Sequence, residues 1–83
     1  MADDGTKEAL IAIGKQLRST RDAMQVSQVQ LAKRIRMDPT NLAKIERGTK
    51  NVTIDTLMRI AAGLGIELVV KFVAPKRAHR DHV

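Results

Sequence analysis

The segment from Ser27 to Gly48 constrains this chain most, because it contains two helix starts close together. Ser27 followed by Gln30 forms a capping box, in which each side chain accepts a hydrogen bond from the other residue's backbone N–H. Asp38 directly before Pro39 places an N-cap ahead of the proline that is favoured in a first helical turn. The segment therefore predicts two consecutive short helices.

Each of these helices has one apolar face, since its apolar residues lie three or four positions apart. Only Arg36, Met37 and Asp38 remain between the helices to form a turn. Two short helices joined so tightly indicate a helix-turn-helix. The core positions that this arrangement predicts are Leu31, Ala32, Ile35, Met37, Leu42 and Ile45.

Three short motifs lie at a characteristic spacing in this segment: Ser27-Gln28, Leu31-Ala32 and Ile45-Glu46-Arg47-Gly48. On these motifs the chain resembles the phage-repressor and Cro superfamily, often called the XRE family, from Ile13 to Leu64. The resemblance implies a mainly helical homodimer that binds double-stranded operator DNA at an inverted repeat and represses transcription. One departure is Arg36, which stands where the family commonly has glycine. We expect Arg36 to adopt a positive φ.

The same resemblance assigns DNA-binding roles, because the second helix of such a motif meets base edges with its first residues. The base-reading positions that it implies are Pro39, Thr40, Asn41 and Lys44. The positions expected near phosphates are Ser27, Gln28, Thr49, Lys50 and Asn51. Asn41 has an alternative role, because its side chain can instead help to satisfy the helix start. Weaker candidates, equally compatible with a solvated face, are Lys33, Arg34 and Arg36.

Arg21 and Glu46 form a further pair that the resemblance implies. In the family, an arginine at this distance before the Ser-Gln start commonly pairs with the glutamate of the Ile-Glu-Arg-Gly motif. We therefore expect an ion pair that ties the first helix to the third. The alternative is two unrelated surface charges, since many surface ion pairs contribute little.

Composition limits the class of protein. The 83 residues suffice for one small domain with a marginal core, and without cysteine neither disulfides nor thiolate metal sites stabilise it. The net charge of +6 suits a polyanion, either nucleic acid or an anionic membrane surface, although a soluble protein with a charged surface has the same balance. No apolar run approaches the roughly 20 residues that span a bilayer, and no signal-peptide core is present. We expect a cytoplasmic protein with no membrane partner.

The flanking segments complete the predicted layout. Residues 1–5 are expected to be flexible, residues 6–65 to form the DNA-binding domain, 66–74 a dimerisation strand, and 75–83 a basic flexible tail. Within the domain, the first helix is expected to begin at an N-cap at Thr6 and to run to about Met24. The fourth is expected to follow an N-cap at Thr53 and to end at Gly63 or Gly65. The predicted buried face of the first helix comprises Leu10, Ile13, Leu17 and Met24.

The segment Ile66–Val73 changes from helical to alternating periodicity, which predicts a β-strand. No other segment has this pattern, so the strand lacks a partner within the chain and is expected to pair with its copy in a homodimer. A strand at this place resembles the HipB-like antitoxins, and the alternative is a fifth helix. The predicted interface residues are Ile66, Leu68, Val70 and Phe72.

The sequence contains no pattern typical of catalysis, a cofactor or a metal site. Asp3 and Asp4 lie at the predicted flexible start, where solvated charge is the simpler interpretation, and His79 and His82 lie in the tail without a third ligand. We therefore expect no enzyme, no cofactor and no bound metal. The favoured function is the autoregulating antitoxin of a toxin–antitoxin operon, with a cognate toxin as a possible partner. The alternatives are a restriction–modification controller, a small phage repressor, or a protein-interaction module that has lost DNA contact.

Overall fold

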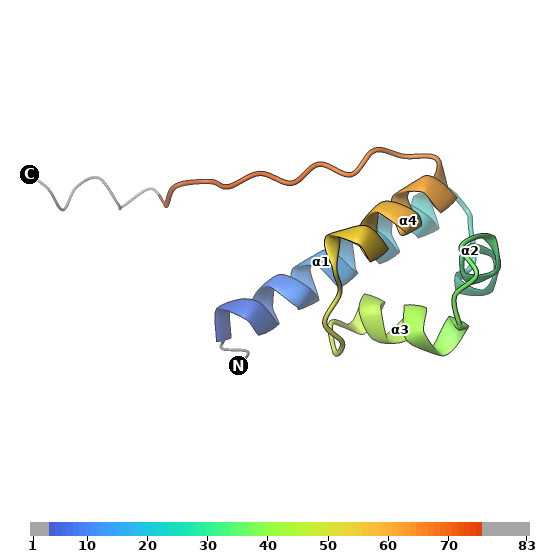
Figure 1. Ribbon diagram of the computed structural model, residues 1–83, viewed down its shortest axis with the longest axis horizontal. Helices are drawn as coiled ribbons and strands as arrows, with labels where there is room; N and C mark the ends of the chain where they lie inside the picture. The colour runs from blue at the N-terminus through green and yellow to red at the C-terminus, as the bar shows by residue number, and fades with distance from the viewer. Residues whose placement is uncertain (1–3, 76–83) are drawn as a thin grey trace, which may run out of the picture.

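The computed structural model describes residues 4–75, which contain four helices: α1 (Asp4–Ala23), α2 (Gln28–Arg34), α3 (Pro39–Arg47) and α4 (Ile54–Leu64) (Figure 1). The mainly helical fold and the helix-turn-helix predicted from the sequence are confirmed. α3 packs against α1 and α2, and α2 also packs against α4. The two helices of the motif are therefore held between the long first helix and the last one.

Three helices start where the sequence predicts. The Ser27 hydroxyl accepts from Gln30 N at 3.0 Å, and Gln30 Oε1 accepts from Ser27 N at 2.8 Å, which is the complete capping box. Asp38 caps α3 by accepting from Thr40 N at 2.9 Å. Thr53 caps α4. These caps depend on residues within one turn of each other, so local sequence determines them.

The predicted start of α1 is wrong. The helix begins at Asp4, so Thr6 lies in its first turn and is not its N-cap. An acidic residue is favoured at the positive end of a helix, and a glycine near an exposed end costs less than one in the interior, so Asp4 and Gly5 extend the helix. Residues 1–3 of the predicted flexible start, and 76–83 of the predicted tail with its two histidines, lie outside the described residues.

The four helices of the described residues all end in the Schellman arrangement, in which the chain turns through a residue with positive φ. Glycines occupy that position after α3 and α4, but Gln25 (φ 60°) and Arg36 (φ 56°) occupy it after α1 and α2. At Arg36 the turn is closed by bonds from Met37 N to Ala32 O at 2.9 Å and from Arg36 N to Lys33 O at 3.3 Å. The expectation of a positive φ at Arg36 is confirmed.

The core lies where the four helices meet. Leu31, Ala32 and Leu42 are completely buried. The predicted core position Met37 is only partly buried and packs at the edge. Met24 is 42% exposed, contrary to prediction, because α1 ends at Ala23 and the following turn carries Met24 outwards. The remaining core residues are Leu17, Val26, Ile35, Ile45, Ile60, Ala61 and Leu64.

Two glycines permit close approach between helices. A Cβ on Gly14 would lie 2.7 Å from Ile45 O and closer still to Glu46 O, so only glycine lets α1 approach the backbone of α3. A Cβ on Gly63 would collide with the Ile35 side chain on α2. The interior glycine of α1 lowers helix propensity, but the packing of α1 on α3 requires it.

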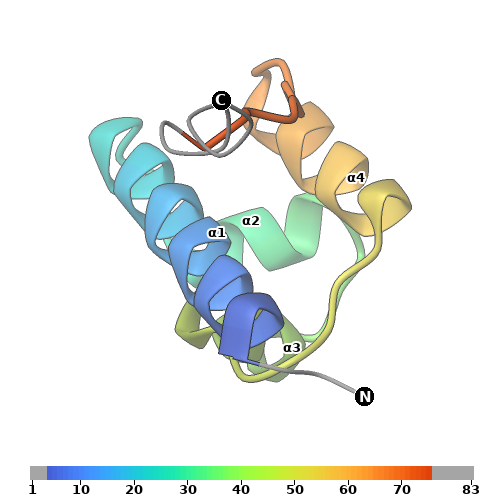
Figure 2. The ribbon, with the colours of Figure 1, turned by 90° about the vertical axis from the view of Figure 1, so that its left-hand side faces the viewer.

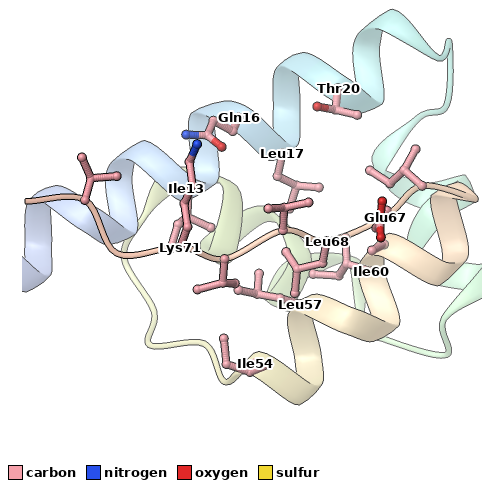
Figure 3. A pocket seen from close by; sticks show the side chains of 15 residues that line it. Ile13, Gln16, Leu17, Thr20, Ile54, Leu57, Ile60, Glu67, Leu68 and Lys71 are labelled. Carbon is pink, nitrogen blue, oxygen red and sulfur yellow. The ribbon is translucent and has the colours of Figure 1, made fainter.

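After α4 the chain continues in an extended conformation along the groove between α1 and α4 (Figure 2). Leu68 is partly buried near Leu57 and Ile60 of α4, and a cavity of about 660 Å³ lies between the segment and the two helices (Figure 3). Residues 4–75 of the single chain contain no β-strand, so the predicted strand and its pairing across a dimer stay predictions. None of the helices in residues 4–75 has the length and apolar character to cross a membrane.

Candidate nucleic-acid interface

The first turn of α3 presents polar side chains on the surface. Asp38 and Pro39 fix where this helix begins, since the carboxylate of Asp38 binds Thr40 N and Pro39 occupies the first helical position. Thr40 and Lys44 are exposed, and Asn41 is half-buried. No acidic residue lies in this first turn. The start of α3 therefore offers the Thr40 hydroxyl and the Asn41 amide, and Lys44 in the last turn of this short helix adds positive charge.

The loop after α3 is fixed to the end of that helix. Lys44 O accepts from the Thr49 backbone N–H at 3.1 Å and from the Thr49 hydroxyl at 3.2 Å. The next residue, Lys50, is thereby held near the start of α3, where its Nζ donates to Asn41 Oδ1 at 3.4 Å. The structure thus brings two predicted site residues together, and it gives the Thr49 hydroxyl a structural partner. Asn51 is exposed.

The first residues of α2 have their own partners. The Ser27 hydroxyl oxygen is occupied by the capping box, although its hydrogen remains free to donate elsewhere. The half-buried Gln28 donates from Nε2 to Glu46 Oε1 at 2.9 Å. A carboxylate only accepts, so this bond uses one of the two amide hydrogens of Gln28 and leaves the other available.

Arg21 and Glu46 form the expected ion pair between α1 and α3. Arg21 Nε and the Glu46 carboxylate are 2.7 Å apart, and a second Arg21 nitrogen donates to the same carboxylate at 3.0 Å. The two side chains are only 9% and 3% exposed. Arg21 also donates to Val26 O at 2.8 Å, which fixes the turn before α2. One guanidinium therefore links α1, α3 and the start of the helix-turn-helix.

This pairing keeps both groups charged. Burial alone would raise the pKa of Glu46, but hydrogen bonds from Arg21 and Gln28 and the Arg21 charge hold that pKa below its ordinary value. The hydrogen bond with Glu46 raises the pKa of Arg21, against an opposing effect of burial. Gln28 thus takes part in a buried network that sequence reasoning did not predict, because its bond to Glu46 spans 18 positions.

Two arginines have structural partners that the sequence also did not indicate. Arg34 donates to Gly63 O at 3.1 Å, and Arg59 donates to Ile35 O at 2.5 Å. Arg34 of α2 thus binds a carbonyl in α4, and Arg59 of α4 binds the carbonyl of the residue that ends α2. Both bonds strengthen the contact between α2 and α4. Arg34 is therefore less available for DNA than Lys33 and Arg36, which are both exposed.

The extended segment that holds the predicted dimer residues lies across the helices from α3 (Figures 1 and 2). It leaves the first turn of α3 uncovered. Within residues 4–75, no group of three or more histidine, cysteine or acidic side chains is placed to hold a metal ion.

Comparison with known proteins gives consistent matches along most of the chain. The family HTH_3, described as helix-turn-helix, matches residues 17–70. The chain is 39% identical over 59 residues to the control protein C.MunI of Mycoplasma sp, covering 70% of this chain and 80% of that protein. It is 33% identical over 58 residues to the immunity repressor protein of Bacillus phage phi105, covering 70% of this chain and 40% of the repressor.

It is also 35% identical over 65 residues to the uncharacterised HTH-type transcriptional regulator y4dL of Sinorhizobium fredii, covering 78% of this chain. The chain spans only 32% of y4dL, as it spans less than half of the phage repressor. Among solved structures, the restriction–modification controller protein C.AhdI of Aeromonas hydrophila is similar with a TM-score of 0.70 and 33% identity. That similarity covers 72% of this chain and 91% of C.AhdI.

Proposed function

The chain belongs to the HTH_3 helix-turn-helix family of DNA-binding regulators, and from this premise we propose that it represses transcription by binding an inverted-repeat operator as a homodimer. The observation that carries this proposal is the exposed first turn of α3, whose polar side chains lie on a helix fixed by a cap and a buried ion pair. Two copies related by a two-fold axis would place their α3 helices about one turn of DNA apart. The protein would act in the cytoplasm.

In this proposal the first turn of α3 reads base edges in the major groove. Lys44 donates to guanine O6 and N7, and Thr40 offers a hydroxyl and a methyl group. Pro39 has no side-chain donor and provides only apolar contact, for example with a thymine methyl. Asn41 is able to pair bidentately with adenine when both its donor and its acceptor are free.

Phosphate contacts come from the start of α2 and from the loop after α3. The free amide hydrogen of Gln28 and the Ser27 hydroxyl hydrogen are available to a phosphate oxygen. Asn51 lies on the loop, and its exposure supports a place near the DNA backbone, whereas Lys50 on the same loop reaches Asn41 at the start of α3. Thr49 supports the loop through its two hydrogen bonds to Lys44 O.

The homodimer would be held by the extended segment after α4. Ile66, Val70 and Phe72 are 39%, 60% and 101% exposed, although they are apolar, and burial of such a side chain contributes roughly 1.5–3 kcal/mol. Antiparallel pairing of this segment with its copy would satisfy backbone groups of both and cover these side chains, together with Leu68. This supports the predicted dimerisation strand.

The operon-level role is supported by relatives rather than by geometry. The match to C.MunI and C.AhdI covers 80% and 91% of those proteins, which supports a restriction–modification controller. The match to the phi105 protein supports a phage repressor, and the antitoxin prediction rests on the extended segment alone. A toxin gene or an endonuclease gene beside the coding sequence would distinguish these roles.

The test is selection of DNA duplexes from a randomised pool by the full-length chain, followed by sedimentation of the complex. We expect enrichment of an inverted repeat, two copies of the chain per duplex, and affinity that falls steeply with added salt. A protein-interaction module without DNA binding would enrich no sequence. That result would refute the proposed function.

A further inference from the structure

Lys50 and Asn41 contact each other beside the base-reading face of α3, a role for that face that rests on the proposed function. Lys50 Nζ donates to Asn41 Oδ1 at 3.4 Å, so the acceptor of the Asn41 amide is directed at an ammonium group. This contact uses only the oxygen of the Asn41 amide, so the two hydrogens of the amide nitrogen stay available as donors. Together the two side chains present donors and positive charge.

Bidentate reading of adenine requires asparagine to have a free acceptor beside its donor. In the major groove adenine presents the N7 acceptor beside the N6 amino donor, so asparagine must both donate and accept. Guanine presents two acceptors, N7 and O6. An ammonium group beside Asn41 Oδ1 repels the N6 amino group of adenine, whose hydrogens are partly positive. It attracts O6 of guanine, which is partly negative.

We propose that Lys50 is a specificity-determining residue, which makes Asn41 read guanine instead of adenine. The loop geometry supports this role. Thr49 attaches the loop to Lys44 O through two hydrogen bonds, which holds the backbone before Lys50 close to α3. Lys44 adds a further donor on the same helix, and the one carboxylate at the start of α3, that of the N-cap Asp38, already accepts from Thr40 N.

The experiment repeats the selection with wild type, Lys50→Met, Asn41→Ala and the double variant. Lys15→Met is the matched control, since it removes one exposed lysine charge from α1, outside the helix-turn-helix. The position read by Asn41 is the one whose base preference disappears in Asn41→Ala. We expect wild type to prefer guanine there.

In Lys50→Met the ratio of guanine to adenine affinity at that position should fall by about 5- to 150-fold, the range of one bidentate contact. Lys15→Met should keep the wild-type ratio. In the Asn41→Ala background, Lys50→Met should change no base preference at this position, because its effect acts through Asn41. If Lys50→Met binds weakly, the ratio of guanine to adenine affinity is measured at lower salt, where DNA binding is tighter.

The inference is overturned if wild type prefers adenine at the Asn41 position, or if Lys50→Met weakens all sequences alike and keeps the ratio within about twofold. The second result would make Lys50 an ordinary phosphate contact. In both cases an inverted repeat is still enriched, so the proposed function stands. Failure of wild type to enrich any sequence overturns the proposed function instead.

Discussion

The Arg21–Glu46 pair allows a prediction whose size follows from its geometry. Three variants are compared with wild type: Arg21→Met, Glu46→Leu and the double substitution, in which each replacement has similar volume to the original. Breaking a buried, hydrogen-bonded pair from one side typically costs about 3–5 kcal/mol of unfolding free energy, because one charge is left buried and uncompensated. Replacing both partners by apolar groups costs far less, since no charge remains.

The two single variants should differ. Arg21→Met leaves the Glu46 carboxylate with Gln28 as its remaining donor and leaves Val26 O without the arginine. The penalty for the uncompensated charge has an upper limit, because the carboxyl can take up a proton instead. From the ordinary pKa of 4.5, protonation at pH 7 costs about 3.4 kcal/mol, at about 1.36 kcal/mol per pH unit. Glu46→Leu leaves Arg21 with Asp22, whose carboxylate lies 3.2 Å away. We therefore expect Arg21→Met to be the more destabilising variant.

The assay is urea unfolding followed by helical circular dichroism, extrapolated linearly to water. The double variant should be less destabilised than the sum of the single variants by about 2–3 kcal/mol, the upper part of the usual range for residues in contact. Arg18→Met is the matched control, because Arg18 is an exposed α1 arginine that has only a long ion pair, 3.8 Å to Asp22, and donates no hydrogen bond to Glu46. It should cost under about 0.5 kcal/mol. Strictly additive single variants would refute the reasoning.

The pKa of Glu46 is lowered in the folded state, so its contribution to stability should be present above pH 4.5 and lost as pH falls through the folded pKa; acid titration of wild type against Glu46→Gln checks this, and equal profiles would contradict it. Gly14→Ala should cost about 1–3 kcal/mol in urea unfolding despite better helix propensity, while Ser19→Ala on the exposed side of α1 should cost almost nothing. Ending the chain after Gly65, or Phe72→Lys, should give a monomer in sedimentation; a stable dimer in both would place the interface on the helices.

The sequence predicted those parts of the fold that depend on neighbouring residues. Ser27 with Gln30, and Asp38 with Pro39, act within one helical turn, so their types alone locate the starts of α2 and α3. The start of α1 was predicted wrongly because no comparable signal marks it and the helix extends past Thr6. A helix start can thus be predicted where a cap side chain accepts from backbone N–H groups. Without such a cap, the predicted start can be wrong by about a turn.

The contacts that build the site were less predictable, because they join distant positions. The resemblance to the phage-repressor superfamily led to the Arg21–Glu46 pair, but nothing in the residues indicated that Gln28 joins it as a third member. The contact of Lys50 with Asn41 depends on how the loop after α3 turns back, and Thr49 determines this through a hydrogen bond to a backbone carbonyl. Backbone carbonyls carry no sequence information, so such partners are found only in the folded chain.

The extended segment after α4 has the sequence pattern of a β-strand but no neighbouring strand within residues 4–75. Its alternating apolar residues predict a strand, but a strand forms only where another backbone supplies hydrogen bonds, and residues 4–75 of the single chain offer none. Leu68 therefore packs in the groove between α1 and α4, whereas exposure rises along the segment to Val70 and Phe72. Val70 and Phe72, at 60% and 101% exposure, lose little burial against their own helices when they meet a second copy, while Leu68 stays packed near α4. A dimer that pairs around Val70 and Phe72 would thus keep each chain's own groove filled.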